Sequence, residues 1–512
     1  MYSTQENNKR IAKNTMLLYL RMIFLMCVTL YTSRVILNAL GVSDFGIYNV
    51  VGGVVTTLGF ISSSLSGATS RFITYELGLK DKGNVTDVFR CSVSIHYLLA
   101  IVLFIIAETI GLWFLMEKLV IPEDRLTAAF WVYQCSVLTF IVLLISVPYN
   151  ALIIAHEKMN MYAYFSIFEA VARLVVAILL AYVSEDRLIV YATLLLAVQL
   201  LVRFLNMYYC NHFLPDVSSK WLWRTDISKK MIVYAGWTVN GNLAYSGYTQ
   251  GLNILLNLFY GPVVNAARGV AVQVQSAVYQ FFGNFLMAVR PQITKSYAQG
   301  DLLYMHSLVL NSCRYSFFLI IIVTLPLLVN TEYILSLWLG LVPNYSVVFT
   351  QLMLLICINN AFAQPLLMAI HATGNIKKFQ MIEGAMLLTI VPIAYILLKF
   401  TQIPPEGVFI VHFVIEIITQ LARVWIVFPR INLDKKRYFI DVFIPAIKVA
   451  IPVMLVGLLI KNYCPTINFS TFVINVLFCF LSVVTILLYI GLKPSERLLL
   501  KAKIKTIIKK KV

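Results

Sequence analysis

The chain has 512 residues, of which 60% are hydrophobic and only 12% are charged. Soluble domains carry roughly 25% charged residues, so this composition excludes an ordinary soluble protein and indicates an integral membrane protein. The formal net charge is +18. A nucleic-acid-binding protein would present such charge on a folded soluble domain, and the polar segments between the apolar stretches are too short to form one, so we expect no nucleic-acid partner.

Apolar stretches recur along nearly the whole chain, and a membrane-spanning helix needs about 20 such residues. We therefore expect an all-α integral membrane protein with about 14 transmembrane helices. Lysine and arginine concentrate in every second loop, which by the positive-inside rule places both termini in the cytoplasm. The predicted spans are residues 15–39, 44–70, 87–115, 127–153, 161–183, 188–210, 231–258, 263–289, 306–329, 346–371, 380–398, 406–428, 439–460 and 469–491.

The longest inner connection, residues 211–230, follows six predicted helices and divides the chain into halves. A shift of 220 residues aligns five identical pairs: Gly41 with Gly261, Ala68 with Ala288, Ile73 with Ile293, Thr74 with Thr294, and Asp81 with Asp301. We therefore predict two parallel repeats: an N-terminal lobe at 1–220 and a C-terminal lobe at 221–430, with two more helices and a basic tail at 431–512. Transporters built from such repeats bind cargo between them and expose it alternately.

The C-terminal segment, residues 492–512 (LKPSERLLLKAKIKTIIKKKV), alternates leucine and isoleucine with basic residues. This pattern predicts a short amphipathic helix attracted to anionic lipids at the inner membrane surface. A simple solubilising tail is the alternative interpretation. Among the eight cysteines there is no CxxC pair and only Cys464 falls in a predicted outer loop, so we expect reduced cysteines and no disulfide framework.

Basic residues inside the spans are the first functional candidates, because a charge at the bilayer centre costs at least ~2.5–3.5 kcal/mol on insertion scales. Arg203, Arg314 and Lys448 lie near inner helix ends, from which we expect them to snorkel to the interface. Arg173 follows Glu169 by four residues, so the two can form a pair on one helix face.

Arg268 is harder to explain, because its predicted span also carries amides through to the inner half. At 100° per residue, Asn265, Arg268, Gln275 and Tyr279 share one face of this helix. The preceding span, 231–258, adds several amides and tyrosines, including Asn240 and Asn253. Hydrogen bonding between helices could explain any one of these residues, but their density in two consecutive spans predicts a hydrated cavity.

The first span adds Arg21 and Arg34, and arginines among neutral amides suit a phosphate or pyrophosphate, whose oxygens guanidinium matches bidentately. The predicted substrate-binding residues are Arg268, Arg34, Arg21, Gln275, Asn265, Tyr279, Asn240 and Asn253. Asp44, Glu416 and His412 are candidates for coupling to H+ or Na+, with a buried structural role as the alternative for the last two and the membrane potential as an alternative driving force. We expect no cofactor, no metal and no catalytic residue.

Residues 33–51, SRVILNALGVSDFGIYNVV, resemble a pattern of bacterial polysaccharide flippases, a branch of the multidrug/oligosaccharidyl-lipid/polysaccharide exporter superfamily. In that pattern an arginine-bearing helix is followed by Leu-Gly, a short turn and an Asp-Phe/Tyr-Gly-x-Tyr run. The helix layout and the basic C-terminus are similar to the same family. The matching positions are Arg34, Leu40, Gly41, Asp44, Phe45, Gly46 and Tyr48.

The resemblance implies a V-shaped, two-lobed fold in the bacterial cytoplasmic membrane. It also implies transport of an undecaprenyl-pyrophosphate-linked oligosaccharide from the inner to the outer leaflet, for surface polysaccharide synthesis. Related lipid II flippases hold pyrophosphate with arginines in their first, second and eighth helices. Arg21 or Arg34 and Arg268 match the first and last of these, whereas the second span has no mid-span arginine, which puts a three-arginine cradle in doubt.

Two alternatives stand beside the flippase. A multidrug or cation antiporter of the same superfamily would have twelve core helices and an essential carboxylate in a lobe. A membrane-embedded polysaccharide polymerase or ligase would show a large outer loop with catalytic arginines or histidines. The longest outer connections, around 116–126 and 330–345, are short, so we expect no enzyme.

Overall fold

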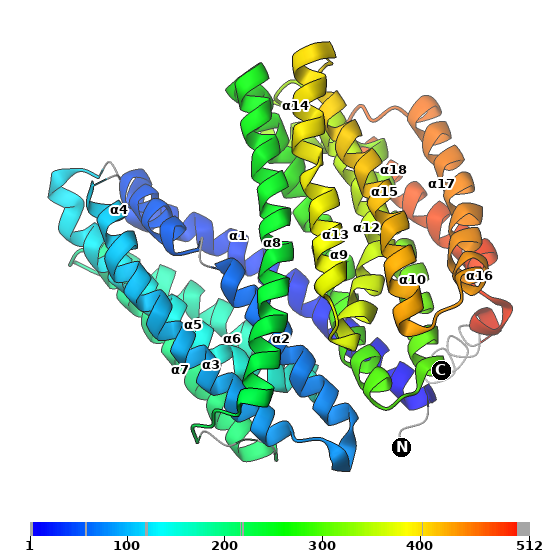
Figure 1. Cartoon of the computed structure of the whole chain (residues 1–512). Coiled ribbons are helices and arrows are strands. Elements are labelled where there is room, and N and C mark those ends of the chain that lie inside the picture. The colour runs from blue at the N-terminus through cyan, green and yellow to red at the C-terminus, as the bar shows by residue number, and fades with distance from the viewer. Residues whose placement is uncertain are drawn as a thin grey trace, which may run out of the picture. The chain divides into compact units, whose positions relative to one another are not determined.

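Helices account for all the regular structure that the computed structural model describes, which comprises residues 4–56, 59–117, 121–215, 217, 220–401 and 403–498 (Figure 1). The predicted all-α membrane fold is therefore confirmed. Residues 499–512 hold most of the predicted amphipathic tail and lie outside the described residues. The short stretch 494–498 before them is helical.

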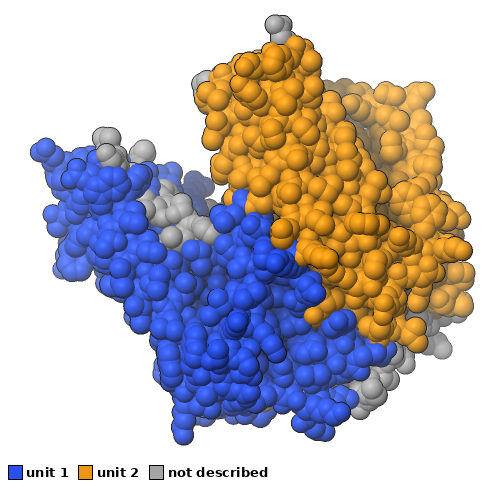
Figure 2. Space-filling view, in the orientation of Figure 1, with its two compact units in different colours: residues 1–243, 290–301, 374–377 blue, residues 244–289, 302–373, 378–512 orange. Residues whose placement is uncertain are grey.

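The chain forms two compact units (Figure 2). Unit 1 comprises residues 1–243, 290–301 and 374–377, and unit 2 comprises residues 244–289, 302–373 and 378–512. Two short segments from the second half of the chain thus belong to unit 1. The lobe boundaries predicted from the sequence stay a prediction.

Unit 1 is built from the helices of the first half of the chain. These are α1 (Thr4–Thr56), α2 (Gly59–Gly78), α3 (Val85–Ile106), α4 (Leu112–Glu117), α5 (Leu126–Ala155), α6 (Met159–Leu179) and α7 (Arg187–Phe213). Short 3-10 turns lie at Lys80–Lys82, Glu123–Arg125 and Leu180–Tyr182, and a π-helical turn joins α3 to α4 at Ala107–Gly111. Two long helices, α8 (Thr225–Tyr260) and α9 (Pro262–Ala298), have residues in both units.

Unit 2 contains most of the remaining helices. These are α10 (Leu302–Val329), α11 (Thr331–Leu339), α12 (Ser346–Thr373), α13 (Lys377–Leu388), α14 (Ile390–Thr401), α15 (Glu406–Ile431), α16 (Lys435–Tyr438), α17 (Ile444–Tyr463) and α18 (Phe469–Ile486). Two π-helical turns, Phe439–Phe443 and Leu487–Gly491, flank the last pair of long helices.

Eleven helices in the described residues are long and apolar enough to cross a membrane. The other three predicted spans also fall in helices. The span 44–70 falls in the end of α1 and in α2, the span 231–258 in α8, and the span 263–289 in α9. α2 carries several serines, and α8 and α9 carry amides and, in α9, Arg268. The chain is a multi-pass integral membrane protein whose most polar helices are α8 and α9 and the segment around α2.

Two of the residue pairs aligned by the 220-residue shift have similar local geometry, while the repeat itself stays a prediction. Gly41 has φ 78° and ψ 171° where the first span ends, and its aligned partner Gly261 has φ 79° between α8 and α9. L-residues rarely adopt this conformation, so both turns require glycine. The aligned pair Thr74 and Thr294 are both buried, and each donates a hydrogen bond to the carbonyl four residues earlier.

Proline explains one break inside a predicted span. α13 ends at Leu388 and α14 begins at Ile390, just before Pro392. The ring of Pro392 clashes with the carbonyl of Leu388 and offers no N–H to it, so the helix breaks there. Pro148, Pro326 and Pro365 lie inside continuous helices.

Each unit has its own apolar core. In unit 1, Phe89, Tyr149 and Leu152 belong to one buried cluster. In unit 2, Phe349 and Phe409 have ring centroids 4.2 Å apart inside another. Large apolar side chains are also exposed along α17 and α18, as a lipid-facing surface requires; examples are Met454, Leu458, Phe478 and Leu481.

Candidate functional site

Arg268 on α9 is buried in unit 2, with 3% of its surface exposed. Its guanidinium donates to Asn253 Oδ1 and, at 2.9 Å, to the backbone carbonyl of Thr249, both on α8. Its Nε has no partner among the described residues. The predicted substrate-binding residues Arg268 and Asn253 are therefore in direct contact, and the buried Nε–H of Arg268 has no acceptor among the described residues.

The other predicted polar residues of α9 lie along the same helix. Gln275 is buried and donates to the Tyr279 hydroxyl at 3.3 Å. That hydroxyl also accepts a hydrogen bond of 2.8 Å from Asn360 of α12. Asn265, one turn before Arg268, has a buried Oδ1 without a partner in the described part of the chain. Hydrogen bonds thus link Gln275 and Tyr279 of α9 to α12, whereas Arg268 lies two turns earlier on the same helix.

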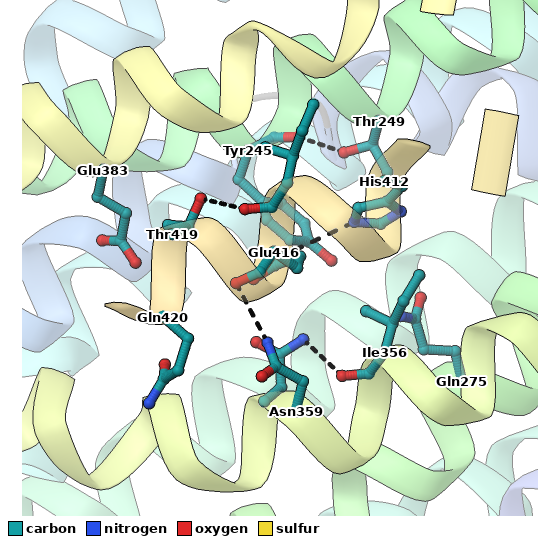
Figure 3. A network of polar contacts seen from close by, with 12 residues as sticks. Tyr245, Thr249, Gln275, Ile356, Asn359, Glu383, His412, Glu416, Thr419 and Gln420 are labelled. Atoms are coloured by element: carbon teal, nitrogen blue, oxygen red, sulfur yellow. Dashed lines mark hydrogen bonds and ion pairs between the residues drawn. The ribbon is translucent and has the colours of Figure 1, made fainter. Parts of the chain in front are cut away.

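A buried acidic network lies on α15 (Figure 3). Arg423 bonds Glu383 Oε1 of α13 at 2.7 Å through Nε and Glu416 Oε2 at 3.1 Å through Nη1. Asn359 of α12 donates to the Glu416 carbonyl at 3.3 Å. Two carboxylates thus share one guanidinium in the interior of unit 2.

His412 lies one turn before Glu416, and its Nε2 is 4.0 Å from Glu416 Oε1. Its ring packs edge-on against Tyr248 of α8 at 5.2 Å. Figure 3 shows His412 and Glu416 between α8, which carries Tyr245 and Thr249, and α12. The two predicted coupling residues of unit 2 are therefore neighbours, and their coupling role stays a prediction.

Unit 1 holds the other predicted residues. Arg21 of α1 lies over the ring of Tyr162 of α6, with 4.7 Å between Cζ and the ring centroid, and its buried Nε has no partner in the described ranges. It lines a cavity of about 880 Å³ bounded by α1, α2, α5, α6 and α7. Arg34 and Asn240 are exposed on α1 and α8.

Asp44, the third predicted coupling residue, is held by Arg125, which bonds Asp44 Oδ2 at 2.6 Å and Asp186 Oδ2 at 2.7 Å. Asp186 caps α7 by accepting from the amides of Leu188 and Ile189. The arginine thus ties the turn after the first span to the starts of α5 and α7. A proton or sodium ion that binds Asp44 would have to compete with Arg125 for its carboxylate.

Two expectations about intramembrane charges have opposite outcomes. Arg173 and Glu169 pair at 2.6 Å, as their spacing predicted. Arg314, expected to snorkel, is instead 1% exposed and bonds Glu496 and Tyr315. The expectation was wrong because the segment after α18 supplies a carboxylate, which the spacing along α10 could not reveal.

Sequence reasoning missed several polar residues that the fold brings to these sites. Asn359 and Asn360 of α12 contact the two networks of unit 2, and Gln199 and Asn206 of α7 line the cavity of unit 1. Their signal was present, since all four are amides inside apolar spans. This signal was overlooked because each of these amides lies alone or in a single pair in its helix, whereas α8 and α9 carry many polar residues.

The fold matches solved structures at low sequence identity. One is an outward-facing multidrug resistance MATE family transporter of the MOP superfamily, with a TM-score of 0.73 and 13% identity over 83% of this chain and 96% of that one. The chain has the fold of the MOP superfamily transporters. A MATE structure in the bent conformation also gives a TM-score of 0.73, at 14% identity, over 83% of this chain and 96% of that one.

A third MOP-fold structure is a transporter from Pyrococcus furiosus Vc1, for which reverse polarity of the binding pocket suggests a different function. Its TM-score is 0.69 at 13% identity, covering 82% of this chain and 96% of that one. No protein-family model and no curated protein matches the chain. The MOP fold is thus established by structure, and the substrate has to be argued from the chemistry of the polar residues.

Proposed function

We propose that the protein is a flippase that moves an undecaprenyl-pyrophosphate-linked oligosaccharide from the inner to the outer leaflet by alternating access, for surface polysaccharide synthesis. Its place would be the bacterial cytoplasmic membrane, with both termini in the cytoplasm. The observation that carries the proposal is Arg268, a buried cation whose Nε has no partner among the described residues.

The surroundings of Arg268 suit a phosphate oxygen. Its two contacts, to Asn253 and to the Thr249 carbonyl, are neutral, so its positive charge is not cancelled by these partners. They hold the guanidinium in place and leave Nε for a further acceptor. Charge-assisted bonds from arginine to phosphate are about twice as strong as neutral ones, which favours an anionic cargo here.

Arg21 repeats the arrangement in unit 1, where an aromatic ring covers the guanidinium and Nε is again without a described partner. The MOP fold supports transport, and the Asp-Phe-Gly-x-Tyr run from Asp44 to Tyr48 supports the polysaccharide branch. The match to the MATE transporter covers 83% of this chain and 96% of that one, so this chain is the longer of the two. This agrees with a chain that extends a twelve-helix core by two helices.

One observation favours the antiporter alternative. Glu383 and Glu416 share Arg423, so unit 2 contains a buried group with more acidic than basic members. A cation antiporter needs such a carboxylate. In the flippase proposal the same group, with His412, is the candidate for H+ or Na+ coupling.

Leaflet translocation in proteoliposomes tests the proposal. With a labelled undecaprenyl-pyrophosphate oligosaccharide, we expect transport by the wild type and a decrease of roughly tenfold or more in Arg268→Ala, because loss of a charge-assisted bond in a buried site costs more than about 1.4 kcal/mol. Arg34→Ala, on the exposed side of α1, tests the second predicted arginine. Arg187→Ala removes an exposed arginine that bonds only backbone carbonyls in the described structure and should transport normally.

Near-normal transport by a well-folded Arg268→Ala protein would remove this arginine from the substrate site. If the wild type moves no lipid-linked sugar but exports an organic cation against a proton or sodium gradient, the antiporter is the correct function. In that case Glu416→Gln should abolish export.

A further inference from the structure

The cavity of unit 1 lies among α1, α2, α5, α6 and α7, and its volume of about 880 Å³ falls within the range of ligand-binding pockets. Its walls are rich in hydroxyl and amide groups. Serines from α1 and α2 face amides from α5 and α7, among them Ser33, Ser62, Asn150, Gln199 and Asn206. Such a lining is unusual inside a helical bundle that must fold in lipid, because every buried polar group needs a partner.

Two of these amides have an unused acceptor. Gln199 is 4% exposed and Asn206 is 2% exposed, yet Gln199 Oε1 and Asn206 Oδ1 have no hydrogen-bond partner among the described residues. They lie seven residues apart on α7, two turns along one helix face. A buried acceptor without a donor has lost its hydration and gained no bond in return, so a ligand that supplies hydroxyl donors would gain from both.

Helices α1 and α6 supply donors and an aromatic surface to the same cavity. Arg21 stacks on Tyr162, and its Nε also has no described partner. Nearby, Arg173 and Glu169 form an ion pair whose side chains are 42% and 29% exposed. The described lining thus has two arginines and one glutamate, a balance that disfavours an organic cation.

Acceptors, donors and an aromatic ring in one cavity match the chemistry of a sugar, which carries both hydroxyl donors and oxygen acceptors. We infer that this cavity is a binding subsite for the saccharide part of the transported lipid, with Gln199 and Asn206 accepting from sugar hydroxyls and Arg21 donating to it. The inference rests on the proposed function and adds the residues that would sense the sugar rather than the pyrophosphate.

Two lipid probes separate sugar recognition from pyrophosphate recognition: undecaprenyl pyrophosphate and undecaprenyl-pyrophosphate-N-acetylglucosamine. Binding of each to purified protein in nanodiscs is measured for the wild type and for Gln199→Leu, Asn206→Leu and Arg268→Ala. We expect the wild type to bind the sugar-bearing lipid at least about 25-fold more tightly than the bare one, about fivefold for each of the two amide acceptors. In each leucine variant this preference should fall about fivefold, which is the effect of losing one neutral hydrogen bond. Binding of the bare lipid should be unchanged.

Leucine replaces each amide with little change of volume, so folding can be checked in the same samples. Because the two oxygens have no described partner, the leucine variants should melt at or above the wild-type temperature. Gln134→Leu, in the same unit but bonded to Glu108 and outside the cavity lining, is the matched control and should bind both lipids normally.

The outcomes distinguish failure of the inference from failure of the proposed function. Equal binding of the two lipids by the wild type, or an unchanged preference in both leucine variants, would mean that the cavity holds only water. Binding of neither lipid would overturn the flippase proposal itself. Loss of bare-lipid binding in Arg268→Ala alone, with sugar preference lost in the leucine variants, would support both.

Discussion

Glu157 shows how one residue can join distant parts of unit 1. It lies between α5 and α6 with a left-handed backbone, φ 59°, and its side chain is 1% exposed. Its carboxylate bonds Arg10 at 2.8 Å, Lys295 at 2.7 Å and Gln292 at 2.7 Å. Lys295 and Gln292 belong to the end of α9 that forms part of unit 1. One carboxylate thus holds the start of α1 and the end of α9 to the α5–α6 connection.

Glu157→Gln should lower the stability of the protein by about 2–4 kcal/mol, because it leaves two cations near one another without their shared anion. The pKa of Lys295, which lies beyond the predicted span 263–289, is held below its ordinary value by burial, against the attraction of Glu157. Loss of that attraction lowers this pKa further. Thermal unfolding in detergent at several pH values measures both effects.

The pH dependence has a definite sign. A lysine whose folded pKa is depressed binds fewer protons in the folded than in the unfolded state between the two pKa values, so stability rises with pH in that window. The variant should therefore recover stability relative to the wild type as the pH rises through the depressed pKa of Lys295. Asp226→Asn, which breaks an exposed pair with Arg224, is the control and should change stability by less than about 1 kcal/mol. A pH-independent loss would mean that Lys295 does not sense Glu157.

Such partnerships mark the limit of what the sequence could predict. The pair Arg173 and Glu169 was predictable because both lie on one helix, four residues apart. Arg423 with Glu383, and Glu157 with Lys295, are pairs from helices that are distant in sequence, and their geometry follows from packing alone. The amide-rich character of α8 and α9 was evident from composition, whereas the contact between Arg268 and Asn253 required the structure.

At the scale of helices, two glycines define equivalent turns. Gly41 and Gly261 both have φ near 78°, and neither has another atom within 4 Å of an added Cβ. Space is therefore available for a side chain, and the obstacle is the backbone conformation itself. Residues held in such regions cost of order 1–3 kcal/mol when they are not glycine.

Gly41→Ala and Gly261→Ala should each lower the unfolding free energy by about 1–3 kcal/mol, or shift the turn and impair assembly of the flanking helices. Gly52→Ala and Gly269→Ala provide matched controls within α1 and α9, since both sites are helical with open space around the added methyl group. These should be neutral or stabilising by about 1 kcal/mol, because alanine favours a helix over glycine. Similar effects at all four positions would show that conformation is not the reason for the glycines.

Element boundaries followed from the sequence where the backbone chemistry is local. The glycine turns lie at single-residue signals, whereas the break before Pro392 falls inside the predicted span 380–398 and was not predicted, although the proline that explains it is in the sequence. The short helix α11 was expected to be a loop, because its nine residues, Thr331–Leu339, are too few to register as a span. The unit boundaries depend on contacts between segments such as 290–301 and the first half of the chain, and no local pattern encodes them.

For the whole molecule, orientation in the membrane is the property on which the direction of transport depends. The predicted cytoplasmic termini rest on the distribution of lysine and arginine among the loops. Two exposed positions can report the orientation of the protein in the membrane. Cys464 follows α17 in a predicted outer loop, and Lys436 in α16 lies in a predicted inner connection. All eight cysteines are free, and Cys27 is the other exposed one.

In intact cells, a membrane-impermeant maleimide should label Cys464 in a Cys27→Ser protein, because the remaining six cysteines are buried. In a protein that also carries Cys464→Ser and Lys436→Cys, labelling should require permeabilisation, since the thiol then lies on the inner side. The reverse pattern would place the termini outside and the basic tail away from the anionic inner leaflet. The proposed direction of transport, from the inner to the outer leaflet, would then lose the support of the charge distribution, and the flippase would have to be abandoned for a transporter of opposite polarity.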